Sequence, residues 1–265
     1  MKISLSILVV LIPFLAFGQM VGWSAIGTGL GNATVAMQSP AAIFSNQAGL
    51  AKLPKLVIAA SAEQRFLLTE LQSISIGAAL PTRSGTFGLV AQSFGYEEFK
   101  QQKLGLAYAR KLWEALSVGA QFDYVNTRIP EYGSRGIFTF EAGVQTSVSK
   151  NLRVGAHVFS PAQVELAEGE NLATILRLGI AWKVSEKLLF VSEVEKDLDY
   201  SPRWKNGLSY QPVEVLYLRT GFATEPSMLF FGLGFAFGNG FEADTAGSFH
   251  QSLGFSPAAG LVWQR

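Results

Sequence analysis

The chain has 265 residues and a formal net charge of +1, so it lacks the strongly basic character of a nucleic-acid-binding protein. Cysteine is absent, which excludes a disulfide framework, a thiolate metal site and a lipid-modified N-terminal cysteine. The sequence combines 27 glycines and 20 phenylalanines with only 15% charged residues, which indicates a β-protein with a crowded interior and an apolar exterior.

Residues 1–18 are typical of a secretory signal peptide. Lys2 precedes a mainly apolar run over 3–17, and the small residue Gly18 precedes a polar one. A membrane-spanning helix is disfavoured because Pro13 interrupts the run, which is shorter than the roughly 20 residues that a bilayer requires. We therefore predict cleavage after Gly18 and export of the mature chain without a helical membrane anchor.

The next segments do not alternate. The stretch PAAIFSNQAGLAKL, residues 40–53, predicts a short apolar helix that runs into a turn. The preceding GTGLGN, residues 27–32, has some likeness to a nucleotide-binding loop. No strand precedes it and its glycine spacing differs from the nucleotide-binding pattern, so a closely packed turn is the better interpretation.

From Leu56 onward the hydrophobic period is two, which predicts β-strands with one apolar face. In the stretch ALSVGAQFDYVNT, for example, Leu116, Val118 and Phe122 share one face, opposite Gln121. Fourteen strands are predicted, near residues 55–65, 72–81, 85–96, 102–111, 115–127, 136–148, 152–160, 173–184, 188–197, 203–211, 215–223, 228–238, 240–249 and 255–264.

The connections between these strands alternate in length. TRSG, KLWEA, SKN, SEK, QPVE and GNG are short and each follows an even-numbered strand, whereas most of the other connections are longer. Short turns at one end and longer loops at the other are typical of an up-and-down barrel in the outer membrane. We therefore predict an all-β fold, a 14-stranded antiparallel transmembrane β-barrel of the outer membrane.

The charged side chains indicate which face lines the lumen. Because Lys or Arg on the lipid side at mid-bilayer costs roughly 2–4 kcal/mol, charges should concentrate on the inner face. Arg177, Lys183, Glu193 and Glu195 all lie opposite the more apolar side of their strands, together with many glycines. Tryptophans fall near strand ends, where aromatic belts meet lipid headgroups.

Several stretches resemble the PorV/PorQ group of outer-membrane proteins, which are relatives of the FadL-type transporters of hydrophobic compounds. They are LGLAYARKLWEALSVGAQFDY, LRVGAHVFSPAQ, LGIAWKVSEKLLFVSEVEKDLDY and GSFHQSLGFSPAAGLVW. SNQAGLAKL is similar to the Asn-Pro-Ala-Gly-Leu element that this superfamily carries before its first strand, with Gln47 in the place of proline. The resemblance implies a partly helical N-terminal luminal plug over residues 19–54 and a barrel over 55–265.

The resemblance leaves two functions open. In FadL-type transporters the plug gates passage of apolar ligands, which implies gated passive uptake of a small hydrophobic compound. Ile43, Phe44 and Leu50 would then contact the ligand or close the lumen, and Asn46 and Gln47 are further candidate ligand or gate residues of the plug. PorV instead serves type IX secretion and PorQ relatives serve cell-surface attachment, which implies a non-transporting partner of an exported or surface protein.

Inward-facing phenylalanines are the candidates for an apolar lumen surface. Strand parity predicts that Phe94, Phe159 and Phe230 point inward, while the other aromatic residues of SMLFFGLGFAF face lipid. With a tight turn at 185–187, Arg177 lies opposite Glu195. A ladder of opposite charges contributes roughly 0.2–1 kcal/mol per pair.

The charges of Arg177, Lys183, Glu193 and Glu195 allow two interpretations, an ion-selective path or a structural salt-bridge network. Mixed signs without a ring of one sign make a poor ion selector, so the structural network is preferred.

Catalytic and metal chemistry are both disfavoured. The two histidines, His157 and His250, have no accompanying ligands at metal-binding spacing. No serine, histidine and acid are brought together by local spacing, so a membrane-barrel hydrolase is disfavoured. The prediction is a non-enzyme without cofactor or metal, whose expected partners are outer-membrane lipid, a small hydrophobic ligand or a protein of the secretion or surface-attachment machinery.

Overall fold

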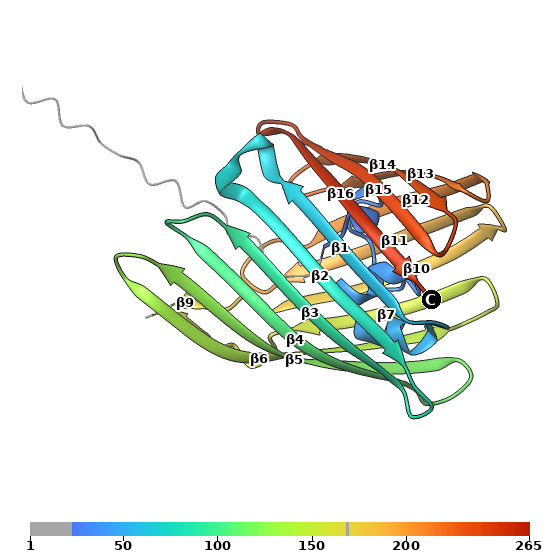
Figure 1. Ribbon diagram of the computed structural model, residues 1–265, viewed down its shortest axis with the longest axis horizontal. Coiled ribbons are helices and arrows are strands. Elements are labelled where there is room, and N and C mark those ends of the chain that lie inside the picture. The colour runs from blue at the N-terminus through green and yellow to red at the C-terminus, as the bar shows by residue number, and fades with distance from the viewer. Residues whose placement is uncertain (1–22, 168–169) are drawn as a thin grey trace, which may run out of the picture.

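The computed structural model describes residues 23–167 and 170–265, so the predicted signal peptide and the first residues of the predicted plug lie outside the described part. Fourteen antiparallel strands form a closed barrel (Figure 1). They are β1 (Val57–Gln64), β2 (Gln72–Pro81), β3 (Thr86–Gly95), β4 (Lys100–Lys111), β5 (Leu116–Ile129), β6 (Gly133–Ser147), β7 (Leu152–Phe159), β10 (Ile175–Ser185), β11 (Leu188–Asp197), β12 (Arg203–Val213), β13 (Leu216–Ala223), β14 (Met228–Phe237), β15 (Phe241–His250) and β16 (Gly254–Gln264).

The predicted fold class and strands are confirmed. Each predicted strand overlaps an observed one, and the largest difference in bounds is at β6, which begins at Gly133 rather than at residue 136. The predicted register of β10 and β11 is also confirmed, because Arg177 pairs with Glu195 and Gly179 pairs with Glu193. Alternation predicted these features well because each strand has one face toward the lumen and one toward the outside of the barrel.

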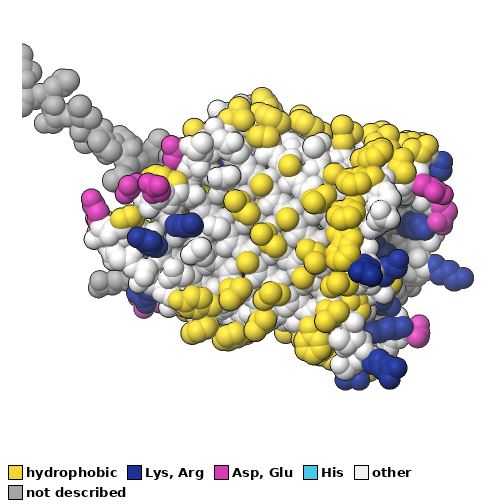
Figure 2. Space-filling view, in the orientation of Figure 1, with side chains coloured by type: hydrophobic (Ala, Val, Ile, Leu, Met, Phe, Trp, Pro, Cys, Tyr) yellow, Lys and Arg dark blue, Asp and Glu magenta, His cyan; other side chains and the backbone are white. Residues whose placement is uncertain are grey.

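The outer face of the barrel is apolar. Large side chains at alternate positions point outward and are exposed, among them Leu106, Phe122, Phe138, Leu178 and Leu233. In Figure 2 hydrophobic side chains are spread over the middle of the wall, and the charged side chains of this view gather at its two ends. This distribution is what a bilayer-spanning barrel requires.

The two ends of the barrel differ in their connections. At the end called here the turn end every connection has two to four residues, whereas at the opposite end the connections range from three to fifteen residues. The chain enters β1 and leaves β16 at the turn end. Leu56 and Arg265 exchange two backbone hydrogen bonds there, of 3.1 and 3.0 Å, beside the β1–β16 pair that closes the barrel. The opposite end, the loop end, carries the longest connection, residues 160–174.

The loop over residues 160–174 contains a small hairpin that the sequence did not predict, formed by β8 (Glu165–Ala167) and β9 (Glu170–Asn171). Strands of three and two residues are too short to show a period of two, which explains the omission. A further connection at the loop end, between β1 and β2, holds two 3₁₀ turns, η3 (Arg65–Leu67) and η4 (Thr69–Leu71).

The segment before β1 is short-helical, with α1 (Ala25–Gly29), η1 (Pro40–Phe44) and η2 (Gln47–Lys52). Ser24 caps α1 by accepting a hydrogen bond from the Gly27 amide, and Pro40 suits the first position of η1 because it needs no amide donor. Among the described residues, no helix is long and apolar enough to cross a membrane.

Candidate functional site

The segment from residue 23 to residue 54, called here the plug, lies inside the barrel (Figure 1). Its helix α1 contacts β1 and β13 to β16, η1 contacts β1 to β3, and η2 contacts β2 to β6. Residues 23–50 are buried except for Asn32, Gln38 and Ser39, which are half-buried. The plug therefore spans the lumen and is in contact with most of the wall.

Inward-facing glycines let the plug approach the wall backbone directly. A Cβ atom at Gly119 on β5 would lie 2.6 Å from the backbone nitrogen of Ala48, closer than real Cβ contacts. Gly179 on β10 is similar, because its Cβ would lie 2.8 Å from a methyl group of Val35. The absence of a side chain at these positions is what allows the plug to fit.

The inner face changes character along the barrel axis. On β10 the inward residues from turn end to loop end are Ala181, Gly179, Arg177 and Ile175. Ala181 belongs to an apolar core shared with the plug, and Gly179 contacts the plug. Arg177 belongs to a layer called here the charge belt, formed by Lys103, Asp123, Glu141, His157, Arg177, Glu193, Glu195 and Lys205. Ile175 belongs to the outer apolar cluster, formed by Val125, Ile137, Phe159, Leu172 and Ile175.

Arg177 and Glu193 join the wall to the plug. The Arg177 guanidinium donates to Glu193 at 2.6 and 3.2 Å, and also to the Thr34 hydroxyl at 3.1 Å and the Asn32 carbonyl at 3.2 Å. Glu193 in turn accepts the Val35 amide at 2.9 Å. Both side chains are buried, so each charge is compensated by its partner and by plug groups rather than by water.

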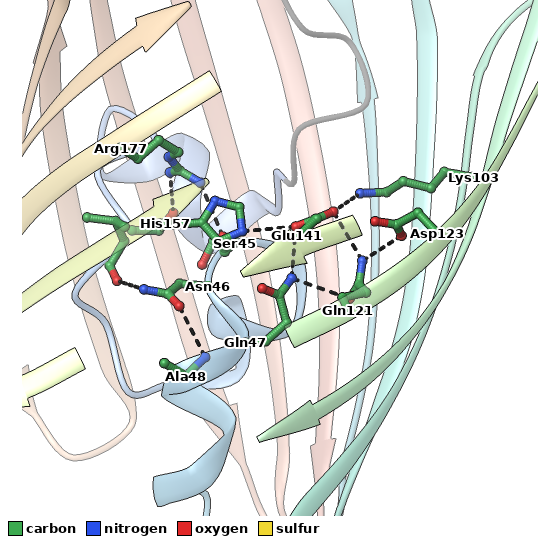
Figure 3. Close-up of polar contacts among 12 residues, drawn as sticks. Ser45, Asn46, Gln47, Ala48, Lys103, Gln121, Asp123, Glu141, His157 and Arg177 are labelled. Atoms are coloured by element: carbon green, nitrogen blue, oxygen red, sulfur yellow. Dashed lines mark hydrogen bonds and ion pairs between the residues drawn. The ribbon is translucent and has the colours of Figure 1, made fainter. Parts of the chain in front are cut away.

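Glu141 is the centre of a second group of contacts (Figure 3). Its carboxylate lies 2.6 Å from the Lys103 amine and 3.0 Å from Nε2 of His157, and it accepts a hydrogen bond from Gln121 at 3.1 Å. The plug contributes Gln47, whose amide donates to Glu141 at 2.8 Å. The Gln47 side chain of the plug thus binds the buried carboxylate of Glu141 on β6, which residues of β4, β5 and β7 also contact.

Two amide side chains hold the middle of the plug by its carbonyl groups. Asn46 Nδ2 donates to the Val35 carbonyl at 2.7 Å and to the Ala156 carbonyl of β7 at 3.2 Å. Gln145 of β6 donates to the carbonyls of Val35 and Met37 at 2.9 and 3.0 Å. Asn46 also caps η2 through its oxygen, which accepts the Ala48 amide. This one residue therefore links the plug turn, the plug backbone and the wall.

The structure places the predicted plug residues in two roles. Ile43, Phe44 and Leu50 are buried in the apolar core between plug and wall, with Ile43 and Phe44 against Gly77 and Leu50 against Gly88. Asn46 and Gln47 make the polar contacts described above.

The three inward phenylalanines are buried but lie apart from one another. Phe159 lies in the outer apolar cluster with the Lys103 amine 5.2 Å from its ring, and Phe94 packs against the Phe99 ring at 6.4 Å. Phe230 is buried on β14. They therefore do not form one continuous aromatic surface.

The prediction that Lys183 belongs to the charge network is wrong. Lys183 lies at the turn end of β10, where its amine pairs with Glu186 at 2.6 Å and its side chain is 40% exposed. Strand parity gives the face of a residue but not its depth, which explains the error. Lys103, Lys205 and Gln145 were not singled out from the sequence, although their parity on β4, β12 and β6 already indicates the inner face.

No family model and no curated protein matches the chain. Solved structures are similar in fold. The Pseudomonas putida toluene transporter TodX has a TM-score of 0.71 at 12% identity, over 92% of this chain and 98% of that one. The Ralstonia pickettii toluene transporter TbuX has a TM-score of 0.66 at 14% identity, over 93% and 98%. A Pseudomonas aeruginosa FadL homologue has a TM-score of 0.65 at 13% identity, over 94% and 98%.

These neighbours are described as transporters or as a homologue of one, and none is described as an enzyme. At such low identity the likeness concerns the fold and leaves the PorV/PorQ resemblance a prediction. The closed fourteen-stranded antiparallel barrel of this chain matches the FadL-type outer-membrane barrels.

Proposed function

We propose that the protein resides in the outer membrane and mediates gated, passive uptake of a small apolar compound. The observation that carries the proposal is the outer apolar cluster, which lies on the inner face at the loop end. Barrels that conduct water and ions have polar interiors, so an apolar cluster on the inner face, here buried against Val164, Leu166 and Ala173 of the loop, suits an apolar ligand. The fold likeness to two toluene transporters supports the same class of compound.

The plug is the gate in this proposal. A compound held at the outer apolar cluster has the charge belt and then the plug between it and the turn end. Passage therefore requires the plug to shift. The contacts that would open are the hydrogen bonds that Arg177 and Gln145 donate to plug carbonyl groups and the one that Glu193 accepts from the Val35 amide.

A reversible lock tests the gate. The chain contains no cysteine, so Ala25→Cys with Ser61→Cys introduces a single possible disulfide between α1 and β1. The Ala25 amide lies 3.3 Å from the Ser61 oxygen, and a cavity of about 10 Å³ beside both residues gives space for sulfur. Because the plug continues directly into β1, this disulfide would fix it at both ends.

We expect proteoliposomes with the reduced protein to take up labelled toluene faster than empty liposomes, and oxidation to abolish the difference. Each single-cysteine variant, treated with the same oxidant, is the control. Uptake equal to that of empty liposomes in both redox states would sink the transport proposal, and equal fast uptake in both states would show that the plug is not the gate.

A second candidate is a non-transporting partner of an exported or surface protein. The near-complete burial of the plug favours this candidate, because a lumen that the plug already fills does not need to hold a ligand. In that case, purification from native membranes in mild detergent should recover a second protein in fixed proportion to the barrel. Recovery of the barrel alone would count against this candidate.

A further inference from the structure

A shallow groove of about 640 Å³ crosses the outer surface of the wall over β6, β7, β10 and β11. The outward residues that shape it are Ala142 and Val144 on β6, Ala156 and Val158 on β7, Leu176 and Leu178 on β10, and Val194 and Lys196 on β11. This volume is within the range of roughly 300–1,000 Å³ that is usual for small-molecule sites. The groove is on the lipid side of the wall and is separate from the plug.

The burial of β7 gives independent evidence that the wall is recessed here. On β4 the outward positions are exposed, as are most of those on β3, whereas every outward position of β7 and of β11 is only half-buried. At the middle of β7 side-chain size contributes to the recess. Ala156 has a single methyl group, and it lies between its pairing partners Val144 and Leu178. The neighbouring strands therefore stand above β7 and form the two sides of the groove.

The loop end of the groove carries a cation. Lys196 is an outward residue of β11, paired with Leu176, and it is the only cation among the outward-facing described residues that line the groove. Its amine donates to the carbonyl oxygens of Leu198, at 3.4 Å, and Tyr200. An ammonium group has three donors, so one remains for a further acceptor.

We propose that this groove binds one acyl chain of an anionic lipid whose phosphate accepts a hydrogen bond from Lys196. The connections longer than four residues are all at the loop end, which assigns this end to the external leaflet. The lipid is accordingly a phosphorylated, multiply acylated glycolipid of the lipid A class. Lipid tails surround the whole wall, so moving an acyl chain from the bilayer into the groove gains no hydrophobic free energy. Retention of the lipid therefore depends on packing in the groove and on the charge of Lys196.

Native mass spectrometry of the full-length protein tests this proposal with purified lipid A as the probe. Ala156→Phe fills the floor of the groove, and Lys196→Gln removes the cation. Ala91→Phe on β3 and Lys100→Gln at the loop end of β4 are matched controls, since both residues are exposed on the outer face away from the groove. Heat-dependent gel mobility and circular dichroism establish that each variant is folded.

We expect a complex with one lipid A molecule, and a bound fraction lower by about fivefold or more in each groove variant but unchanged in the controls. Phosphatidylcholine should be retained less than lipid A, and Lys196→Gln should remove that difference. Equal binding by groove and control variants, or equal retention of the two lipids by the unaltered protein, would overturn the proposal. A protein dimer that Ala156→Phe abolishes would also overturn the proposal, because the groove would then be an interface between two copies of this chain.

Discussion

Two ion pairs that involve β10 have the same separation and opposite surroundings. The nitrogen–oxygen distance is 2.6 Å both for Arg177 with Glu193 and for Lys183 with Glu186. The side chains of the first pair are 1% exposed, whereas those of the second are 40% and 89% exposed. The nitrogen–oxygen distance alone therefore says little about how much each pair contributes to stability, and the difference in burial determines it.

Arg177→Met should lower the free energy of unfolding by about 3–5 kcal/mol, because the buried carboxylate of Glu193 loses its nearest cation and keeps only Lys205, at 3.4 Å. Lys183→Met is the matched control and should cost at most about 1 kcal/mol, because water screens the exposed pair. Urea-induced unfolding of the barrel from lipid vesicles measures both values. Equal losses for the two variants would contradict the structural role given to Arg177.

Gln47 is the position where proline is found in the family that the sequence resembles. The backbone already suits proline, since Asn46 is extended (φ −146°, ψ 107°) and Gln47 is the first residue of η2. The structural difference thus lies in the side chain, which binds Glu141.

Gln47→Ala should cost about 1.5–3 kcal/mol of unfolding free energy, because a hydrogen bond to a buried carboxylate is lost. Gln47→Pro should lose the same bond but recover about 0.4–1 kcal/mol by restricting the unfolded chain. Denaturant unfolding compares the two, and limited proteolysis reports release of the plug. A Gln47→Pro variant less stable than Gln47→Ala would show that the turn does not accept proline.

At the scale of elements, the plug and the wall fit because glycines on the wall face the plug backbone. Gly119 is opposite the start of η2, where a Cβ atom would meet Ala48. Gly238, in the turn between β14 and β15, has open space around it. The same substitution at these two positions therefore separates plug packing from the general effect of replacing a glycine.

Gly119→Ala should displace η2 and cost about 1–3 kcal/mol, as overpacking of a dense core does. Hydrogen exchange at the amides of residues 47–52 should become faster. Gly238→Ala should change stability by no more than about 0.5 kcal/mol and leave those amides unchanged. Unaltered exchange in Gly119→Ala would mean that the wall, rather than the plug, absorbs the extra methyl group.

The strands could be predicted from the sequence, and the contacts of the plug could not. Alternation predicted the strand bounds and faces because it reflects a local rule, an apolar outer face of the barrel on one side of each strand and the lumen on the other. The contact of Gln47 with Glu141 joins residues 94 positions apart, and no local pattern encodes it. Alternation also does not give the depth of a residue along the barrel axis, as the position of Lys183 at the turn end shows.

At the scale of the whole molecule, the barrel wall and its filling are separate structures. Every barrel strand pairs with two neighbours, so the hydrogen bonding of the wall does not depend on the plug. A fourteen-stranded barrel lies between the eight-stranded barrels that side chains can fill and the 16–18-stranded barrels that leave a channel. The plug occupies the space that this intermediate width creates.

A chain that lacks residues 23–52 should therefore still form a barrel, and it should conduct ions in planar bilayers. Exposure of the charge belt to water would favour a hydrated lumen. The intact chain, prepared in the same way, is the control and should show little conductance. A folded but non-conducting deletion variant would place the seal at the loop end, in the outer apolar cluster and the loop above it.

The pairing of β1 with β16 has a consequence for the order of assembly. Leu56, at the base of the plug, is bonded to Arg265 beside the β1–β16 pair, so the ring is complete only once β16 has joined β1. The plug precedes every barrel strand in the chain and is later enclosed by them. The plug must consequently lie against the sheet before the sheet closes, because a closed barrel has no gap between strands through which a segment that contacts most of them could enter.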